Sequence, residues 1–422
     1  MNAATRLFIE AHADDDVQQL AFLAARYPDV DMPFALNQIA GRRMARTKLP
    51  LWASIERLIY PPHLSMEQCS SEQTAIYKAA LVRRISMFIS SQSPVSTQPL
   101  PLQWVDLTGG MGVDFSFIAP LFQRSVYVER QSQLCEMARN NFPLLGLERS
   151  EVVCGDATDY LREMEPADWI YLAPARRNEN GGKTVLMSDC MPDVTQLLNT
   201  LLDKACCVLL KLSPMLDWQY AVSVLNREEC IVREVHIVAV KNECKELLMV
   251  LANHKKEKQE LKENSIKIFC VNNNDIFCYK EEVNSSKENT LQLSKINKNA
   301  LSTLYLYEPN ASIMKAGCFA LLSKTYNVAA LSNNSHLFVS PVLLSNFPGR
   351  RFRIMDICTL NKKEIRHALT NITRANIAVR NFPIGVDALR KRLKLHDGGD
   401  NYIFATTYGE KEHILIISKK EV

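Results

Sequence analysis

A glycine-rich stretch carries the first residues whose types and spacing could bind a ligand. Residues 104–107 form a short apolar run, which breaks into three glycines within four positions and resumes as a helical pattern from Phe115. We predict a buried strand, a tight turn and a helix start, because side chains at the turn would keep the backbone away from a ligand. The candidate binding residues of this stretch are Asp106, Thr108, Gly109, Gly110, Gly112 and Asp114.

Two acidic residues follow the next two predicted strands at positions that suit a nucleoside. Glu129 ends the run 125–129, and a carboxylate at the tip of a second strand can accept both hydroxyl groups of a ribose. Asp156 follows the third predicted strand, where an acid can accept a hydrogen bond from the amino group of adenine. With the adjacent Arg130 and Ala157, these residues predict an adenosine-type cofactor. If the glycines are considered without these acidic residues, the alternative is a strand–helix turn with a structural role only.

The elements that must position these residues alternate between strands and helices from residue 102 to about residue 252. Repeated strand–helix units imply a parallel sheet with right-handed crossovers. Two apolar runs, 231–240 and 247–251, follow each other without a helix, which implies an antiparallel hairpin at the sheet edge. A dehydrogenase would continue to six parallel strands. We therefore predict the α/β class, with a Rossmann-like, seven-stranded sheet typical of class I methyltransferases, which use S-adenosylmethionine.

Three further positions have open interpretations. Asp114, at the expected helix start, could cap that helix or reach the ammonium group of the cofactor's methionine part. Arg176 and Arg177 follow the turn after strand four, where a guanidinium could hold a phosphate or carboxylate of the substrate. An ordinary ion pair with Asp189 or Asp193 is the alternative for these two arginines.

The composition narrows the class of protein. The chain has 422 residues, of which 47% are hydrophobic and 23% are charged, and these values are typical of globular proteins. No apolar run reaches 18 residues and the first residues do not form a secretory signal, so no membrane span is expected. The twelve cysteines are scattered without a Cys-x-x-Cys pair, which argues against a metal site and favours reduced thiols in the cytoplasm.

The C-terminal part concentrates positive charge. Residues 347–394 contain twelve Arg and Lys against three acidic residues, a net of +9, whereas the whole chain carries +4. Such a stretch favours capture of RNA phosphates, with a solvated basic surface as the alternative.

A polar, proline-containing stretch at 91–101 marks a boundary between helical and strand-rich parts.

The chain resembles the bacterial class I methyltransferases that carry a THUMP-like C-terminal domain and, more distantly, the cap-guanine N2 methyltransferases. The stretches that carry the resemblance are DLTGGMGVD (106–114), GDATDYL (155–161), PARR (174–177), SDCMPD (188–193), KLSPMLD (211–217), KNECKEL (241–247), EPNASIMKAG (308–317), NSHLF (334–338), FPGR (347–350) and DGGDNYIFAT (397–406). The resemblance covers essentially the whole chain. It implies a helical region at 1–95, a catalytic domain at 96–253, a connector with a ferredoxin-like domain at 254–345 and a THUMP-like domain at 346–422. It also implies S-adenosylmethionine as cofactor and RNA, with tRNA favoured, as partner.

One position departs from the family pattern. Strand four there ends in an acid, Asn or Ser before Pro174, and its oxygen orients the amine that accepts the methyl group; here Ala173 stands at that position. A backbone carbonyl of the turn could orient the substrate, Asp189 or Asp193 could replace the acceptor, or the chain could bind the cofactor with little transfer. Losing one orienting group slows transfer without abolishing it.

The leading prediction is therefore an RNA methyltransferase acting on a base nitrogen in tRNA or rRNA. An RNA-binding protein with a catalytically weakened methyltransferase domain is the alternative. We expect Pro174, Arg176 and Arg177 to act in catalysis and Ala173 to line the cofactor site. Residues 254 to about 295 are rich in Lys and Asn with short apolar fragments such as 266–271, and we expect a strand-poor connector or the edge of a small α+β unit.

Overall fold

The computed structural model describes residues 1–91, 103–176, 187–227, 229–252, 265–282, 298–409 and 411–421. The chain divides into two compact units. The first contains Met1–His236 and Lys245–Lys267, and the second contains Ile237–Cys244 and Ile268–Val422. The predicted boundary stretch at 92–101 lies outside the described residues, so the four-part division stays a prediction.

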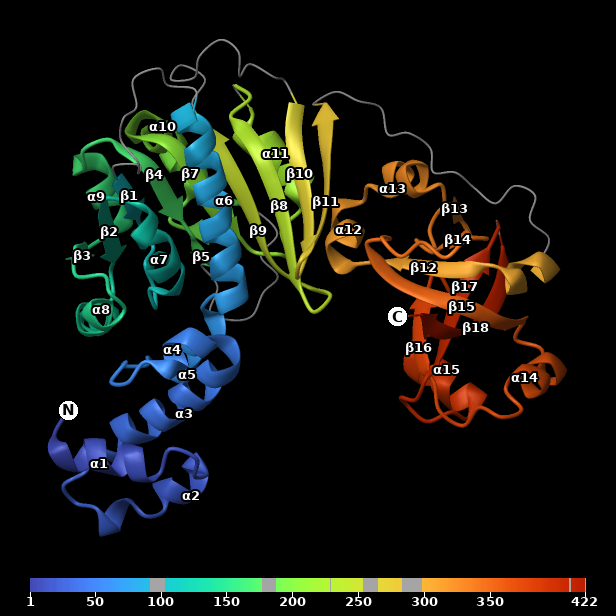
Figure 1. The fold of residues 1–422 in the computed structure, drawn as a ribbon, viewed down its shortest axis with the longest axis horizontal. Helices are drawn as coiled ribbons and strands as arrows, with labels where there is room; N and C mark the ends of the chain where they lie inside the picture. Colours follow the sequence, from blue (N-terminus) through green and yellow to red (C-terminus); the bar gives the residue numbers. More distant parts are fainter. Residues whose placement is uncertain are drawn as a thin grey trace. The chain divides into compact units, whose positions relative to one another are not determined.

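The N-terminal region is helical, as predicted (Figure 1). Its helices are α1 (Ala3–Ala11), α2 (Val17–Ala21), α3 (Met32–Lys48), α4 (Pro50–Ser54), α5 (His63–Gln68) and α6 (Glu72–Ser91), with a 3₁₀ turn at Ala24–Arg26. The side chains of Asn2, Asp16 and Asp31 accept backbone N–H groups in the first turns of α1, α2 and α3. These caps satisfy donors that a helix N-terminus leaves without partners.

A single long helix beginning near Met66 is predicted by the sequence, but α5 and α6 are separated. The backbone is extended at Cys69, and the Oγ of Ser71 accepts the N–H of Thr74 at 3.3 Å, which starts a new helix. Ser70 lies in this break and is buried, so its hydroxyl group is available to residues of the neighbouring sheet.

The larger sheet of the protein has nine strands. Its strands are β1 (Gln103–Asp106), β2 (Arg124–Glu129), β3 (Ser150–Cys154), β4 (Ala167–Leu172), β7 (Ala205–Leu212), β8 (Val232–Val240), β9 (Glu243–Ala252), β10 (Ser265–Asn272) and β11 (Asp275–Glu282). Their order is β3-β2-β1-β4-β7-β9-β8-β10-β11. The pairs β1–β2, β1–β4, β2–β3 and β4–β7 are parallel, whereas β7 and β9 are antiparallel.

The β8–β9 hairpin is present as predicted, but its predicted place at the sheet edge was wrong. Two more strands, β10 and β11, extend the seven expected ones beyond it. The turn between β8 and β9 contains Lys241 and Asn242, both with positive φ (52° and 63°), as in the tight turns of two-residue hairpins. The prediction that residues 254–295 are poor in strands was wrong for β10 and β11. Alternate residues Ile266, Ile268 and Cys270 are buried in β10, which is the pattern of a strand with one covered face.

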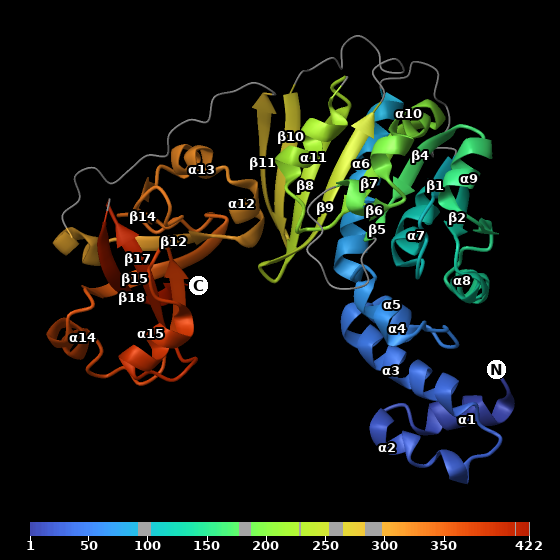
Figure 2. The same ribbon diagram turned by 180° about the vertical axis from the view of Figure 1, so that it is seen from behind.

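Helices α7 (Val113–Ile118), α8 (Ser132–Leu144), α9 (Ala157–Glu163), α10 (Val194–Lys204) and α11 (Trp218–Leu225) follow the strands of the first unit. The long helix α6 lies along one face of the sheet (Figures 1 and 2). Two side-chain bonds fix it there: Trp169 Nε1 of β4 donates to Ser86 Oγ at 2.9 Å, and the hydroxyl of Tyr77 lies 2.7 Å from His236 Nδ1 of β8. Helix α6 of the N-terminal region is therefore packed against this sheet.

The second unit contains a seven-stranded sheet ordered β13-β14-β12-β15-β18-β17-β16. Its strands are β12 (Tyr305–Pro309), β13 (Ala329–Ala330), β14 (Phe338–Ser340), β15 (Gly349–Cys358), β16 (Asn376–Arg380), β17 (Asn401–Tyr408) and β18 (Glu412–Glu421), and its helices are α12 (Ala311–Ala316), α13 (Phe319–Tyr326), α14 (Lys362–Ala368) and α15 (Val386–Leu393). The sequence predicts strands near 351–357, 375–380, 402–407 and 413–418 and helices near 362–369 and 386–393, and all of them are present. The turn before β17 uses Gly398 and Gly399, with φ of 90° and 80°.

Candidate active site

The glycine loop after β1 has a separate steric reason for each of two glycines. A Cβ on Gly109 would lie 2.1 Å from the ring of Tyr127, and a Cβ on Gly112 would lie 2.9 Å from Phe142. Gly112 also has a φ of 81°, which favours glycine. The loop backbone is therefore packed directly onto the aromatic core at these two positions.

Hydrogen bonds join this loop to the ends of β1, β2 and β4. Asp106 Oδ1 accepts the N–H of Thr108 at 2.9 Å, and Glu129 Oε2 accepts the N–H of Gly110 at 2.9 Å. The N–H of Ala173, after β4, donates to Thr108 Oγ1 at 2.7 Å. Because β1 lies between β2 and β4, this is the point where the strand order reverses, and open α/β sheets bind ligands at that point.

Glu129 lies at the loop, as the cofactor prediction requires. Its side chain is 8% exposed, and its second oxygen, Oε1, accepts the N–H of Gln131 at 2.9 Å. A carboxylate has about four lone-pair directions, so two bonds from the chain leave acceptor capacity for ligand hydroxyl groups. Asp106 is buried beneath the loop, and burial raises its pKa well above the ordinary value, although the N–H of Thr108 opposes this shift.

Asp156 and its neighbours lie at the ends of β3 and β2. Asp156 is exposed and begins α9, where its Oδ1 accepts the N–H groups of Thr158 and Asp159 at 2.7 and 3.4 Å. Ala157 is the first residue of α9. Arg130 is exposed, and its Nη1 lies 3.5 Å from the sulfur of Met191.

The turn after β4 is described in part. Ala173 and Pro174 are half-buried, and the backbone of Ala175–Arg176 (β5) pairs with Cys190–Met191 (β6). Arg177 lies outside the described residues, as does the side chain of Arg176. The proposed alternative partner Asp193 instead caps α10, where its Oδ1 accepts the N–H of Thr195 at 3.0 Å.

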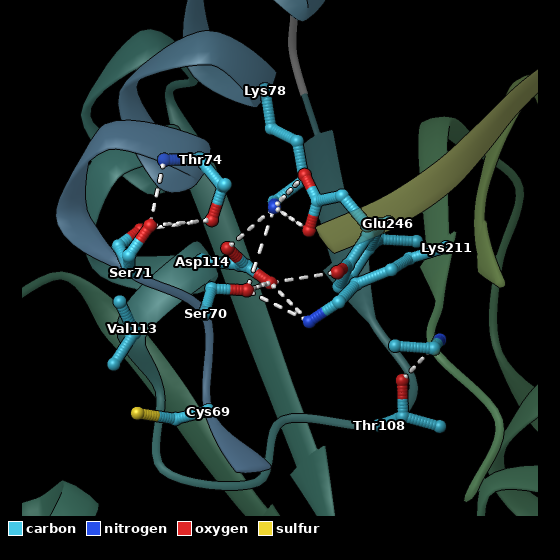
Figure 3. A network of polar contacts seen from close by, with 12 residues as sticks. Cys69, Ser70, Ser71, Thr74, Lys78, Thr108, Val113, Asp114, Lys211 and Glu246 are labelled. Atoms are coloured by element: carbon cyan, nitrogen blue, oxygen red, sulfur yellow. Dashed lines mark hydrogen bonds and ion pairs between the residues drawn. The ribbon is translucent and has the colours of Figure 1, made fainter. Parts of the chain in front are cut away.

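A cluster of buried charges lies beside the glycine loop, and the sequence did not indicate it (Figure 3). We call it the polar core; its members are Ser70, Lys78, Asp114, Tyr171, Lys211 and Glu246. The ammonium group of Lys78, which is fully buried, contacts both carboxylate oxygens of Glu246 at 2.6 and 2.7 Å and lies 3.2 Å from Asp114 Oδ1. This ion-pair set joins α6, α7 and β9.

Asp114 was predicted to cap α7, and that prediction was wrong. The capping position is Gly112, and α7 has no side-chain cap. Asp114 Oδ2 instead accepts hydrogen bonds from Ser70 Oγ and Tyr171 OH, both at 2.7 Å, and lies 3.4 Å from Lys211 Nζ. Asp114 points away from the helix terminus because the two lysines of the polar core attract its carboxylate.

Charges within the polar core oppose the effect of burial on Asp114 and Lys211. Burial alone would raise the pKa of Asp114, but the ammonium groups of Lys78 and Lys211 outweigh burial and hold that pKa below its ordinary value. Burial would lower the pKa of Lys211, yet the carboxylates of Asp114 and Glu246 raise it. Burial, followed by the charge of Asp114, raises the pKa of Tyr171. Asp114 and Lys211 therefore stay charged at neutral pH, and Tyr171 keeps its proton.

A second ion pair holds α6 against β8. Glu234 accepts hydrogen bonds from Arg84 Nη1 at 3.1 Å and lies 3.0 Å from His236 Nε2. Burial would raise the pKa of Glu234, but hydrogen bonds from His236 and Arg84 lower it to about 2. Burial lowers the pKa of His236. These contacts are structural, since they lie beside α6 rather than at the glycine loop.

The basic residues of the second unit divide into two groups. Arg350 Nε and Arg380 Nη2 donate to the buried Glu308 at 2.6 and 2.8 Å, and Arg353 Nε pairs with Glu421 at 3.0 Å. Within the described residues, a second group is exposed and has no acidic partner; it comprises Lys362, Lys363, Arg366, Arg374, Lys391, Arg392 and Lys394. Most of this second group lies on α14 and α15 or beside them.

The described residues contain no group of three metal-ligating side chains, and none of their helices is both long and apolar enough to cross a membrane.

Comparisons with known proteins agree with this arrangement. A THUMP domain-like family model matches residues 349–420, and a ferredoxin-like domain model matches residues 305–348. Among solved structures, that of a proposed methyltransferase from Porphyromonas gingivalis W83 is similar over 100% of this chain and 98% of its own, with 27% identity and a TM-score of 0.77. No curated protein matches this chain.

Two other structures match smaller parts. A SAM-dependent methyltransferase from Agrobacterium tumefaciens is 18% identical over 44% of this chain and 63% of its own, with a TM-score of 0.31. A tRNA m1G37 methyltransferase from M. jannaschii is 14% identical over 44% of this chain and 52% of its own, with a TM-score of 0.31.

The strand order and the glycine loop, which contacts Glu129 and Ala173, are those of the class I methyltransferase fold. With its ferredoxin-like and THUMP-like C-terminal domains, the chain is similar over its whole length to the P. gingivalis protein, as the sequence motifs predicted.

Proposed function

We propose that the chain transfers a methyl group from S-adenosylmethionine to a base nitrogen of an RNA, and that tRNA is the first substrate to test. The observation that carries the proposal is the hydrogen-bonded glycine loop at the point where the strand order of the sheet reverses. There the glycine loop, Glu129 and the Ala173 turn are joined across the ends of three adjacent strands.

The residues present fit this cofactor. A Cβ on Gly109 or Gly112 would collide with the aromatic core, so glycine at these positions lets the loop pack onto Tyr127 and Phe142 at the strand ends. Glu129 retains acceptor capacity for the ribose hydroxyl groups, and the exposed Asp156 could accept from adenine. Arg130 and Ala157 would lie beside these contacts.

When bound, the cofactor supplies a methyl group on a sulfonium centre, which an amine can attack directly. The nitrogen–carbon bond forms as the carbon–sulfur bond breaks, S-adenosylhomocysteine leaves, and the proton of the methylated nitrogen passes to water. The chain's task is to hold the nucleophile in line, and alignment of this kind contributes most of the rate in a two-reactant step.

Alanine at position 173 determines how the amine is oriented. Since Ala173 has no side-chain acceptor and its N–H is bonded to Thr108, the backbone carbonyls of the Ala173–Pro174 turn would accept from the amine. Arg176 and Arg177 would hold a substrate phosphate beside Pro174. The second candidate function is an RNA-binding protein that binds the cofactor but transfers slowly, and Ala173 is the feature that favours it.

The second unit would supply affinity for RNA. The seven exposed basic residues without acidic partners, defined above, would neutralise phosphates and make binding depend on salt. The twelve cysteines are scattered without a Cys-x-x-Cys pair, which fits a reaction in the reducing cytoplasm.

The test is incubation of the protein with S-adenosylmethionine carrying a labelled methyl group and total RNA from a strain that lacks this protein. We expect label in one nucleoside of one RNA class. Cofactor binding without any transfer in a single turnover would favour the second candidate function, and absence of cofactor binding would contradict both.

A further inference from the structure

We propose that Lys211 binds the carboxylate of the methionine part of S-adenosylmethionine, and that Ser70 and Asp114 hold the ammonium group of Lys211 in position. This inference rests on the proposed cofactor. It adds a binding residue other than the glycine loop and Glu129. It also gives the N-terminal region a part in the cofactor site, because Ser70 precedes α6.

The order of groups along the carboxyl edge of the sheet matches the order of groups in the cofactor. Adenine is expected at Asp156 after β3 and the ribose at Glu129 after β2, with the glycine loop next, after β1. The sulfonium and amino-acid parts must then extend toward β4 and β7, since β3 is the last strand in the other direction. Adjacent strands are about 4.8 Å apart, so the glycine loop after β1 lies one spacing from β4 and two from β7.

Lys211 stands at the next place in this order. Leu210 of β7 pairs with Leu172, the last residue of β4, so Lys211 lies level with Ala173 in the active-site turn. Its side chain is directed back across β4 to Ser70 and Asp114, the second residue of the helix that follows the glycine loop (Figure 3).

The hydrogen-bond donors of Lys211 are incompletely used. An ammonium group has three N–H donors; two are directed at Ser70 Oγ, at 2.7 Å, and Asp114 Oδ2, at 3.4 Å. In the part of the chain that the structure describes, the third has no acceptor, and the side chain is 22% exposed. Lys78 is fully buried and bonded to both oxygens of Glu246, so it has no access to a ligand.

The contact between Lys211 and Asp114 leaves Lys211 able to bind another acceptor. At 3.4 Å it is longer than the 2.7–2.9 Å range of a tight charge-assisted bond. Lys211 can therefore bind a second carboxylate without breaking a strong ion pair. Asp114 and Glu246 keep Lys211 protonated because they raise its pKa.

Calorimetric titration of the full chain with matched ligands tests the proposal. For Lys211→Met we expect the affinity for S-adenosylmethionine to fall about 10- to 100-fold, the effect of losing a hydrogen bond to a charged group. The affinity for 5′-methylthioadenosine, which lacks the amino-acid part, should change by no more than about twofold. Lys211→Arg should restore much of the loss. Lys204→Met, which removes a lysine bonded to the carbonyl of Met164, is the matched control and should change neither affinity.

The outcomes separate this inference from the proposed function. Equal losses for both ligands, or an unchanged affinity for S-adenosylmethionine, would overturn the role of Lys211. Failure of the unmodified chain to bind S-adenosylmethionine would refute the proposed cofactor instead. If Lys211→Met does not fold, decarboxylated S-adenosylmethionine decides: the unmodified chain should bind it at least about tenfold more weakly, and equal affinity would overturn the proposal.

Discussion

Replacement of Lys78 by methionine is expected to destabilise the first unit by about 3 to 5 kcal/mol. Methionine is similar in length but carries no charge, and Lys78 is fully buried against Glu246 and Asp114. Without it, two buried carboxylates are balanced only by Lys211. Removing one partner of a buried ion pair is costly because the remaining charge has neither water nor a counter-ion.

Urea unfolding followed by tryptophan fluorescence measures this loss in the relevant unit. All four tryptophans, Trp52, Trp104, Trp169 and Trp218, belong to the first unit and are buried. The signal therefore reports that unit even when the second unfolds separately.

The matched control is Arg124→Met, which removes an exposed ion pair with Glu151. Exposed pairs contribute between zero and about 1 kcal/mol, so the control should lose little stability. The double variant Lys78→Met/Glu246→Leu removes a whole buried pair and should recover more than half of the single variant's loss. A single-variant loss no larger than the control's, or a double variant less stable than the single, would refute the reasoning.

Three further predictions concern the cofactor site, the active-site turn and pH. Glu129→Gln should weaken S-adenosylmethionine binding about tenfold by calorimetry, because an amide cannot accept from the N–H groups of Gly110 and Gln131 and also from the ribose. The control is Glu151→Gln at an exposed site. Equal affinity of the Glu129→Gln variant and the unmodified chain would contradict the assignment. Ala173→Asp should raise the single-turnover transfer rate about tenfold by orienting the amine, whereas Ala175→Asp should not; no change at position 173 would count against an orienting role. The pKa of Glu234 falls from 4.5 to about 2 on folding, so its stabilising contribution is complete above pH 4.5 and is lost as pH falls toward 2. Glu234→Gln should flatten this part of the unfolding profile, and Glu163→Gln, at an exposed site, should leave it unchanged.

The glycine loop and the C-terminal elements could be predicted because their signals are local. Three glycines after a short apolar strand predict a tight turn regardless of the rest of the chain. The elements after residue 346 each show their own periodicity, and the Gly398-Gly399 turn separates helix from strand. The β8–β9 hairpin followed from two apolar runs with no helix between them.

The polar core could not be predicted, because its members are distant in the sequence. Lys78 lies in the middle of a helix and Glu246 in a strand, 168 positions apart, and the sequence does not distinguish a buried lysine from an exposed one. The same holds for Lys211, because its place at a strand end does not indicate which side chains it contacts. The capping role predicted for Asp114 failed since tertiary attraction from two ammonium groups outweighed a local helix preference.

Strands β10 and β11 were missed for a different reason. The segment from 254 to 295 is rich in Lys and Asn, and this composition hid the alternation of Ile266, Ile268 and Cys270. Pairing with an existing sheet supplies the backbone hydrogen bonds and one covered face that such a segment needs. A window shorter than the polar surroundings would have detected the period.

Titration of the full chain with S-adenosylmethionine tests the central claim most directly. The account predicts saturable one-to-one binding, displacement by S-adenosylhomocysteine, and no binding of NADH under the same conditions. Absence of binding to S-adenosylmethionine, or displacement by NADH, would contradict the assignment of the glycine loop and Glu129 to this cofactor.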